Sequence, residues 1–237
     1  MADKEYSYED FLAIIAALRG ENGCPWDKVQ THESLKPCMM EEAAELLASI
    51  RIYEKTGNPE NMIEELGDVL LQVVMHAQIA SENSLFTMKD VVNGVSRKMV
   101  RRHPHVFGTG SADTPDEVLV NWEEIKKEEK KDKEWAKSPL REIPQELPAL
   151  TRAVKVMKKI DKYYEKGSTY EEDTAAVCEL AAALRDCDFQ TEHQKVEEIL
   201  ADLLLRISDV ARITKIPQEQ VLTDRIEDLI EKYEQNE

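Results

Sequence analysis

Apolar residues recur at three- and four-residue spacing along almost the whole chain, which is the spacing of one face of an α-helix. Between residues 8 and 18, for example, the apolar positions are Phe11, Ile14, Ile15 and Leu18. No segment shows a convincing alternation of apolar and polar residues, the mark of a half-buried strand. The 237 residues include only eight glycines, and Leu, Ala, Glu and Lys dominate, so propensity also favours helix. The sequence therefore predicts an all-α fold.

Helix breakers divide this pattern into two halves. Thr87 fits an N-cap and Pro115 fits the first turn of a helix, while residues 22–26 and 103–115 are expected to form a turn and a loop. Prolines cluster at positions 139, 144 and 148, so we predict domains of residues 1–138 and 139–237. The predicted helices cover residues 8–18, 35–53, 60–81, 88–102, 115–137, 150–164, 172–185, 192–213 and 218–234.

The second half echoes the first at a constant offset of 134 residues. Seven identities relate residues 64–79 to residues 198–213, and without a gap the same offset pairs Glu45 with Glu179 and Arg51 with Arg185. The alternative explanation is a chance similarity between two unrelated amphipathic helices, because Leu and Glu are common in both. One ungapped offset across two helices and their connecting loop favours a duplicated helical module.

Two groups of carboxylates fall on consecutive predicted helices. On the first helix, Glu42 and Glu45 share a face and Glu41 lies one turn from Glu45; on the second helix, Glu65 and Asp68 are three residues apart. A Thr-Gly-Asn-Pro breaker between them predicts an antiparallel helical hairpin that sets the two groups face to face. Up to five carboxylates then converge on one small volume.

Such convergence needs a counter-ion, because like charges repel and burying them is costly. An all-oxygen ligand set suits Mg²⁺ or Mn²⁺ better than zinc. Gly67, in the interior of the second helix, costs about 1 kcal/mol relative to alanine, which a closely approaching ligand or backbone would explain. The simpler alternative is a solvated acidic helix face. The long apolar stretches beside both acidic groups argue against it.

The carboxylate pattern resembles the EExxE…ExxD signature of the MazG family of all-α nucleoside triphosphate pyrophosphohydrolases, and three further motifs agree with it. The resemblance is dense in the first half and in the second half appears chiefly as Leu-Pro-Ala-Leu at residues 147–150 and the repeat. The motifs are Glu41-Glu42-x-x-Glu45 with Glu65-x-x-Asp68, Asn22-Gly-Cys-Pro-Trp-Asp-Lys28, Lys98-x-x-Arg-Arg-His-Pro-His-Val-Phe107 and Asn121-Trp-Glu-x-Ile-Lys126.

This resemblance implies metal-dependent hydrolysis of a nucleoside triphosphate between the α- and β-phosphates, giving a monophosphate and pyrophosphate. By matching position, Glu42, Glu45, Glu65 and Asp68 would hold Mg²⁺, for which Mn²⁺ can substitute. Glu41 would act with Glu42 in catalysis, binding a further ion or orienting the attacking water. The metal would polarise the phosphoryl oxygens and lower the pKa of the water.

Basic and aromatic residues would then bind the substrate. A predicted helix ends with the basic residues Lys98, Arg101 and Arg102. Their spacing alone fits phosphate binding and a favourable pairing of cations with the helix C-terminus equally well. The resemblance favours phosphate contact. Trp122 is expected to stack on the base, although a tryptophan more commonly packs in a core.

Two further pairs have weaker roles. Trp26 fits a role in packing as well as it fits substrate contact. Lys28 either reaches the site or points to solvent. His103 and His105 have no third nitrogen or sulfur ligand nearby in the sequence, so we interpret them as residues that fix a loop.

The second half departs from the carboxylate pattern. At the offset of 134 residues, Ala176 replaces Glu42 and Ile199 replaces Glu65, and only Glu179 and Asp202 survive. Two carboxylates do not assemble the site, so we predict that this half binds no catalytic magnesium and serves packing, dimerisation or control.

Composition limits the partners. A net charge of −17 argues against duplex DNA, whose binding needs a broad basic face, but not against a metal-bound polyphosphate. We expect a nucleoside triphosphate substrate, no nucleic acid and no membrane. The four cysteines have no zinc-like spacing, and the N-terminus lacks a signal peptide, so we expect free thiols and a cytoplasmic location.

A helical hairpin buries too little surface alone, so a homodimer is expected to complete the bundle. Two rival functions remain open. A regulator or adaptor that retains the fold would leave the carboxylates idle. A ferritin-type di-metal protein would need Glu-x-x-His on paired helices, and no such pair is present.

Overall fold

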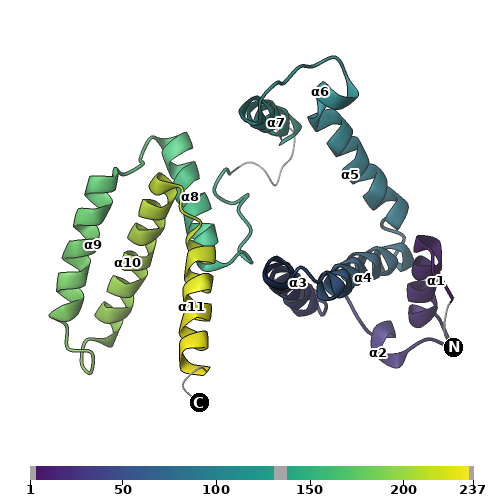
Figure 1. Ribbon diagram of the computed structural model, residues 1–237, viewed down its shortest axis with the longest axis horizontal. Coiled ribbons are helices and arrows are strands. Elements are labelled where there is room, and N and C mark those ends of the chain that lie inside the picture. The colour runs from purple at the N-terminus through teal and green to yellow at the C-terminus, as the bar shows by residue number, and fades with distance from the viewer. Residues whose placement is uncertain (1–3, 131–137, 235–237) are drawn as a thin grey trace. The chain divides into compact units, whose positions relative to one another are not determined.

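The computed structural model describes residues 4–130 and 138–234, and every regular element in these ranges is a helix (Figure 1). The all-α prediction is therefore confirmed for the described residues. The helices are α1 (Tyr8–Arg19), α2 (Pro25–Lys28), α3 (Lys36–Thr56), α4 (Glu60–Glu82), α5 (Met88–Arg102), α6 (Pro104–Phe107), α7 (Pro115–Lys130), α8 (Ala149–Tyr164), α9 (Tyr170–Arg185), α10 (His193–Thr214) and α11 (Gln218–Glu234).

The chain forms two compact units, residues 1–123 and 124–237, and the division falls within α7. The boundary predicted at residue 138 lies further along the chain. The predicted extension of α7 from residue 131 to 137 lies outside the described residues.

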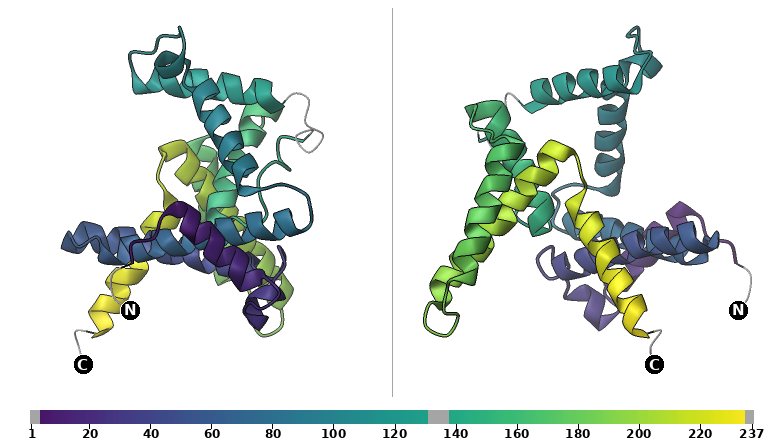
Figure 2. Two further views of the ribbon diagram at one scale, coloured as in Figure 1. Left: turned by 90° about the vertical axis from the view of Figure 1, so that its right-hand side faces the viewer. Right: turned by 60° about the vertical axis from the view of Figure 1, so that its left-hand side comes forward.

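The first unit is built around the antiparallel hairpin of α3 and α4, which lie side by side (Figures 1 and 2). Gly57 ends α3 with φ of +71°, the left-handed conformation that glycine adopts at little cost. The Asn58 side-chain oxygen then accepts a 2.9 Å hydrogen bond from the backbone N–H of Glu60. The Thr-Gly-Asn-Pro breaker thus makes the tight turn that brings the two carboxylate-bearing helices together.

The core of the first unit lies where α1 packs on α4. Ile15 from α1 and Val74, Met75 and Ile79 from α4 are nearly inaccessible to solvent, together with Leu35, which precedes α3. This apolar cluster fixes the C-terminal half of α4. The N-terminal half of α4 carries Glu65, so the carboxylates sit beside a rigid core.

Thr87 begins a helix, as the sequence predicts. Thr87 begins α5 with a capping box, in which its backbone N–H donates to the Asp90 carboxylate at 2.9 Å. The same box begins α1 at Ser7 and α9 at Thr169.

Two short helices were missed by the sequence analysis. Helices α2 and α6, each of four residues, occupy segments predicted as turn and loop, and each begins with a proline, Pro25 and Pro104. Four residues make barely one turn, so neither segment is long enough to show helical periodicity.

The second unit contains α8 to α11, with α9 and α10 as its long hairpin (Figure 1). Helix α9 begins 134 residues after α3, and α10 begins 133 residues after α4, close to the offset found in the sequence.

A buried polar network links the start of α9 to α10. The Ser168 hydroxyl lies 2.8 Å from a carboxylate oxygen of Asp173 and 2.6 Å from one of Asp209. Arg206 donates to Asp173 at 3.0 Å, and Arg212 donates to Asp209. Both aspartates are almost completely buried, and each has its own arginine as counter-ion.

In the described ranges, no helix combines the length and the apolar character that crossing a membrane requires.

Candidate metal centre

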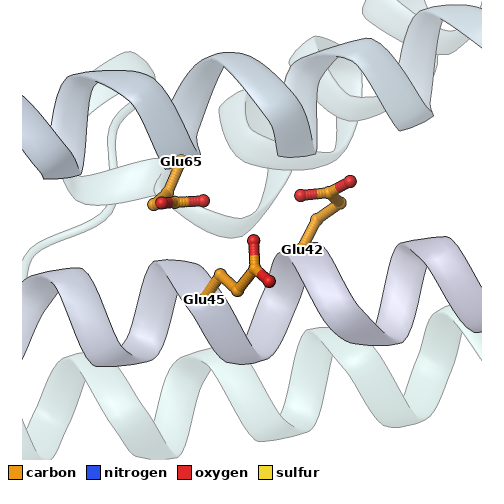
Figure 3. A group of neighbouring side chains, drawn as sticks. All are labelled: Glu42, Glu45 and Glu65. Atoms are coloured by element: carbon orange, nitrogen blue, oxygen red, sulfur yellow. The ribbon is translucent and has the colours of Figure 1, made fainter.

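Three glutamates from the two helices of the first hairpin converge on one point. Glu42 and Glu45 come from α3 and Glu65 from α4, and each offers a carboxylate oxygen within 4.8 Å of the others. Figure 3 shows the three side chains directed into the space between the helices. The spacing of three residues puts Glu42 and Glu45 on one face of α3, and the turn at Gly57 brings Glu65 opposite them.

The cluster is partly withdrawn from water. Glu65 is 9% exposed, and one of its carboxylate oxygens accepts a 2.9 Å hydrogen bond from the Asn61 side-chain amide. Burial raises the pKa of the Glu42 carboxyl above its ordinary value of 4.5, and the charges of Asp68, Glu45 and Glu65 raise that pKa further. The apo cluster thus resists full ionisation.

These features fit a divalent cation. The ligand atoms are all carboxylate oxygens, which magnesium and manganese prefer, and a cation would offset the repulsion that raises the pKa of Glu42. Among residues 4–130 and 138–234, this is the one group of three or more such side chains close enough to hold a metal.

Asp68 and Glu41, the other two carboxylates of the motif, lie outside the group of three. Asp68 is half-buried three residues beyond Glu65 on α4, near enough to raise the pKa of Glu42, but it is outside the group of three. Glu41 is exposed on α3. Their roles stay predictions.

One predicted substrate-binding residue at the end of α5 lies against an aromatic side chain. The Arg102 guanidinium lies over the Trp122 ring, 5.0 Å from its centroid, and the His103 ring meets the same tryptophan edge-on at 5.1 Å. Lys98, one turn before Arg102, is half-buried, and Arg101 is exposed. The structure thus brings the predicted phosphate-binding and base-stacking residues Arg102 and Trp122 into direct contact.

Of the two histidines after α5, His103 is hydrogen-bonded to the end of that helix. The His103 Nδ1 lies 2.7 Å from the Met99 carbonyl oxygen, and the rings of His103 and His105 are 5.6 Å apart. Neither residue belongs to a group that would hold a metal among the described residues.

The segment before α3 carries the other two predicted substrate-binding residues. Trp26 is 58% exposed, and the Lys28 ammonium donates a 2.6 Å hydrogen bond to the Glu21 carbonyl. Gly23 makes the turn possible, because a Cβ there would lie 2.1 Å from the Leu18 carbonyl oxygen. Substrate contact by Trp26 and Lys28 stays a prediction.

Arg19 attaches this segment to the hairpin, a contact that the sequence does not predict. Its side chain is only 6% exposed and donates to the carbonyls of Asp27 and Gln30 and to the Glu82 carboxylate, the last at 2.8 Å. An arginine at the end of an amphipathic helix carries no signal of burial, and Glu82 lies 63 residues away, so no local pattern reveals the contact.

Gly67 has open space around it. A Cβ at this position would meet no atom within 4 Å, so no backbone packs against the glycine within the described residues. A close backbone approach is thus excluded there as the reason for this glycine.

The second hairpin holds a pocket where the first holds its glutamates. The pocket has a volume of about 810 Å³ and contains Glu179 and Asp202, the surviving carboxylates, together with Ala176 and Arg206. No group of three metal-ligating side chains forms in its described residues.

Comparison with known proteins identifies the family. A family model described as the MazG nucleotide pyrophosphohydrolase domain matches residues 30–107. The MazG nucleoside triphosphate pyrophosphohydrolase/pyrophosphatase of Thermotoga maritima is 36% identical over 230 residues, which cover 97% of this chain and 85% of that protein. The chain belongs to the MazG family. The resemblance seen in the motifs is therefore confirmed.

Two further relatives extend the comparison. The nucleoside triphosphate pyrophosphohydrolase of Escherichia coli is 39% identical over 210 residues, covering 85% of this chain and 76% of that protein. YabN of Bacillus subtilis is 43% identical over 219 residues, and this chain spans only 44% of its length.

The MazG match encloses the whole carboxylate motif and the basic end of α5. Residues 30–107 include α3, α4 and α5, whereas Trp26, Lys28 and Trp122 lie outside the matched range. The family match therefore bears most directly on the glutamate cluster.

Proposed function

We propose that this MazG chain hydrolyses nucleoside triphosphates between the α- and β-phosphates, releasing a nucleoside monophosphate and pyrophosphate with the help of Mg²⁺. The convergence of Glu42, Glu45 and Glu65 is the observation that carries the proposal. Relatives named as nucleoside triphosphate pyrophosphohydrolases at 36% and 39% identity support the same reaction.

The glutamates and Asp68 would hold the metal. Bound magnesium would polarise the phosphoryl oxygens and lower the pKa of the attacking water. Glu41, exposed beside the cluster, would orient that water or bind a further ion. Manganese is expected to substitute, because it accepts the same oxygen ligands.

The end of α5 would bind the substrate. The negative charge of the phosphates would be neutralised by Lys98, Arg101 and Arg102, together with the magnesium held at the cluster. Arg102 already lies over one face of Trp122, so a base would stack on the rest of the aromatic surface. Lys28 and Trp26 are proposed as further contacts.

We also propose a homodimer. Leu47 on α3 and Ile63 and Leu66 on α4 are 66%, 65% and 51% exposed, respectively, although they belong to the central hairpin of the first unit. A second copy that covers these side chains would remove their apolar surface from water. The four free cysteines agree with the cytoplasm as the proposed location.

Product analysis tests the reaction. The full chain is incubated with ATP or dTTP and Mg²⁺, and pyrophosphate with the matching monophosphate is expected. Orthophosphate with a diphosphate would contradict the proposal, and no product would favour a regulator that retains the fold. Glu42→Gln and Asp68→Asn are each expected to abolish turnover while the helical circular dichroism spectrum is preserved.

Asp202→Asn is the matched control. Asp202 holds the position of Asp68 in the second hairpin, where we propose that no catalytic magnesium binds. Its substitution is expected to leave turnover unchanged, and a comparable loss would contradict the assignment of catalysis to the first unit.

A further inference from the structure

Gln72 is a buried polar side chain that faces the glutamate cluster. It lies on α4 one turn beyond Asp68, so it shares the face of the helix that looks towards α3. Its side chain is only 5% exposed, and its carbonyl oxygen Oε1 is buried without a hydrogen-bond partner. A buried carbonyl oxygen without a partner costs free energy, which is regained only when a donor reaches it.

The other end of the same amide contacts a predicted ligand. The Gln72 side-chain amide donates a hydrogen bond to the Glu42 carboxylate. A neutral donor is well suited to this position, because it orients the Glu42 carboxylate without supplying a charge that would repel a cation.

The second hairpin carries a different residue at the position equivalent to Gln72. The residue 134 positions after Gln72 is Arg206, which donates to the buried carboxylate of Asp173 at 3.0 Å. The second unit therefore carries its own cation at this position, whereas the first unit carries an amide and lacks one there. The charge of the first cluster is left for an external ion.

We propose that Gln72 is a positioning residue of the metal centre: its NH₂ group holds Glu42 in place, and its Oε1 accepts a hydrogen bond from a water bound to the metal. This inference rests on the proposed metal site. It accounts for both ends of the amide, since each polar atom of Gln72 then has a partner.

The test measures Mn²⁺ binding to the full chain without nucleotide. Gln72→Met keeps the length of the side chain and removes both polar atoms, and it is expected to weaken Mn²⁺ binding about tenfold, as losses of such supporting hydrogen bonds do. Gln78→Met is the matched control. Gln78 lies on the same helix and also donates to a glutamate, Glu82 at 3.0 Å, away from the cluster, so its substitution should leave the affinity unchanged.

Exchange of the metal-bound water separates positioning from a merely structural role. Oxygen-17 relaxation in the presence of Mn²⁺ should show faster exchange in Gln72→Met than in the wild type, because one bound water has lost its acceptor. A purely structural defect would lower the melting temperature of the metal-free protein without changing this exchange rate.

The outcomes are distinct. If the wild-type chain binds no Mn²⁺, the proposed metal site fails and the inference fails with it. If the wild type binds Mn²⁺ and Gln72→Met binds it equally, only the inference is overturned. Should Gln72→Met not fold, Gln72→Arg takes its place: the introduced cation is expected to pair with Glu42 and abolish Mn²⁺ binding, and retained binding would overturn the inference.

Discussion

At the scale of single residues, the ionisation of Glu42 links metal binding to stability. Its pKa is raised by burial and by three neighbouring carboxylates, so the folded chain keeps a proton at pH values where the unfolded chain has released it. The stability of the metal-free protein should therefore fall as pH rises from the ordinary value of 4.5 through the raised pKa. A bound cation would favour the ionised form of Glu42 and would offset this loss of stability.

Glu42→Gln should consequently have opposite effects with and without metal. Without metal, the variant is expected to melt at a higher temperature than the wild type at pH 7, because one repelling charge is gone. With Mg²⁺ at a hundred times its Kd, the wild type should gain about 2.7 kcal/mol for one site, and the variant should gain little. Calorimetric scans with EDTA and with Mg²⁺ measure both effects. A magnesium response in Glu42→Gln equal to that of the wild type would remove Glu42 from the ligand set.

Two glycines of the first unit should respond to alanine in opposite directions. Gly67 is helical and has open space around it, so Gly67→Ala is expected to stabilise the metal-free protein by up to about 1 kcal/mol. At Gly23 the added Cβ would overlap the Leu18 carbonyl, so Gly23→Ala should destabilise the protein. Urea unfolding measures both changes, and equal effects at the two positions would contradict the contacts described here.

At the scale of elements, Arg19 joins α1 to the segment before α3 and to the end of α4. Arg19→Met is expected to destabilise the first unit by about 2 kcal/mol, because its bonds to Glu82 and to two backbone carbonyls are charge-assisted and its side chain is buried. The exposed pair of Arg185 and Asp186 is the control, and Arg185→Met should cost less than about 0.5 kcal/mol. Equal losses in urea unfolding would show that burial of Arg19 contributes nothing.

The same elements show what a sequence reveals and what it hides. The long helices were predicted to within a few residues, because a periodic apolar face extends over several turns, as in α4 and α10. The meeting of Glu42, Glu45 and Glu65 followed from their spacing and from the breaker between the helices. Gln72 and Arg19 were not found, since their importance depends on burial and on partners in other elements, which no local pattern records.

At the scale of the whole molecule, the two units differ in how the negative charge of their clustered carboxylates is balanced. The first gathers Glu42, Glu45 and Glu65, whose charges an external cation would balance. The second buries Asp173 and Asp209 with Arg206 and Arg212 as built-in counter-ions. The second unit, in which Ala176 and Ile199 stand at the positions of Glu42 and Glu65, thus has an internal charge balance.

The exposed apolar residues of the first hairpin lead to the prediction of assembly. Light scattering of the wild type at micromolar concentration is expected to give twice the 27.2 kDa mass of one chain. Ile63→Glu places a charge on the exposed face of α4 and should yield the single-chain mass, because a buried unpaired charge is costly in an interface. Leu85→Glu, at an equally exposed position beyond the end of α4, is the control and should stay dimeric. A wild-type chain with the single-chain mass would contradict the homodimer, and an Ile63→Glu variant that remains dimeric would move the interface away from this face.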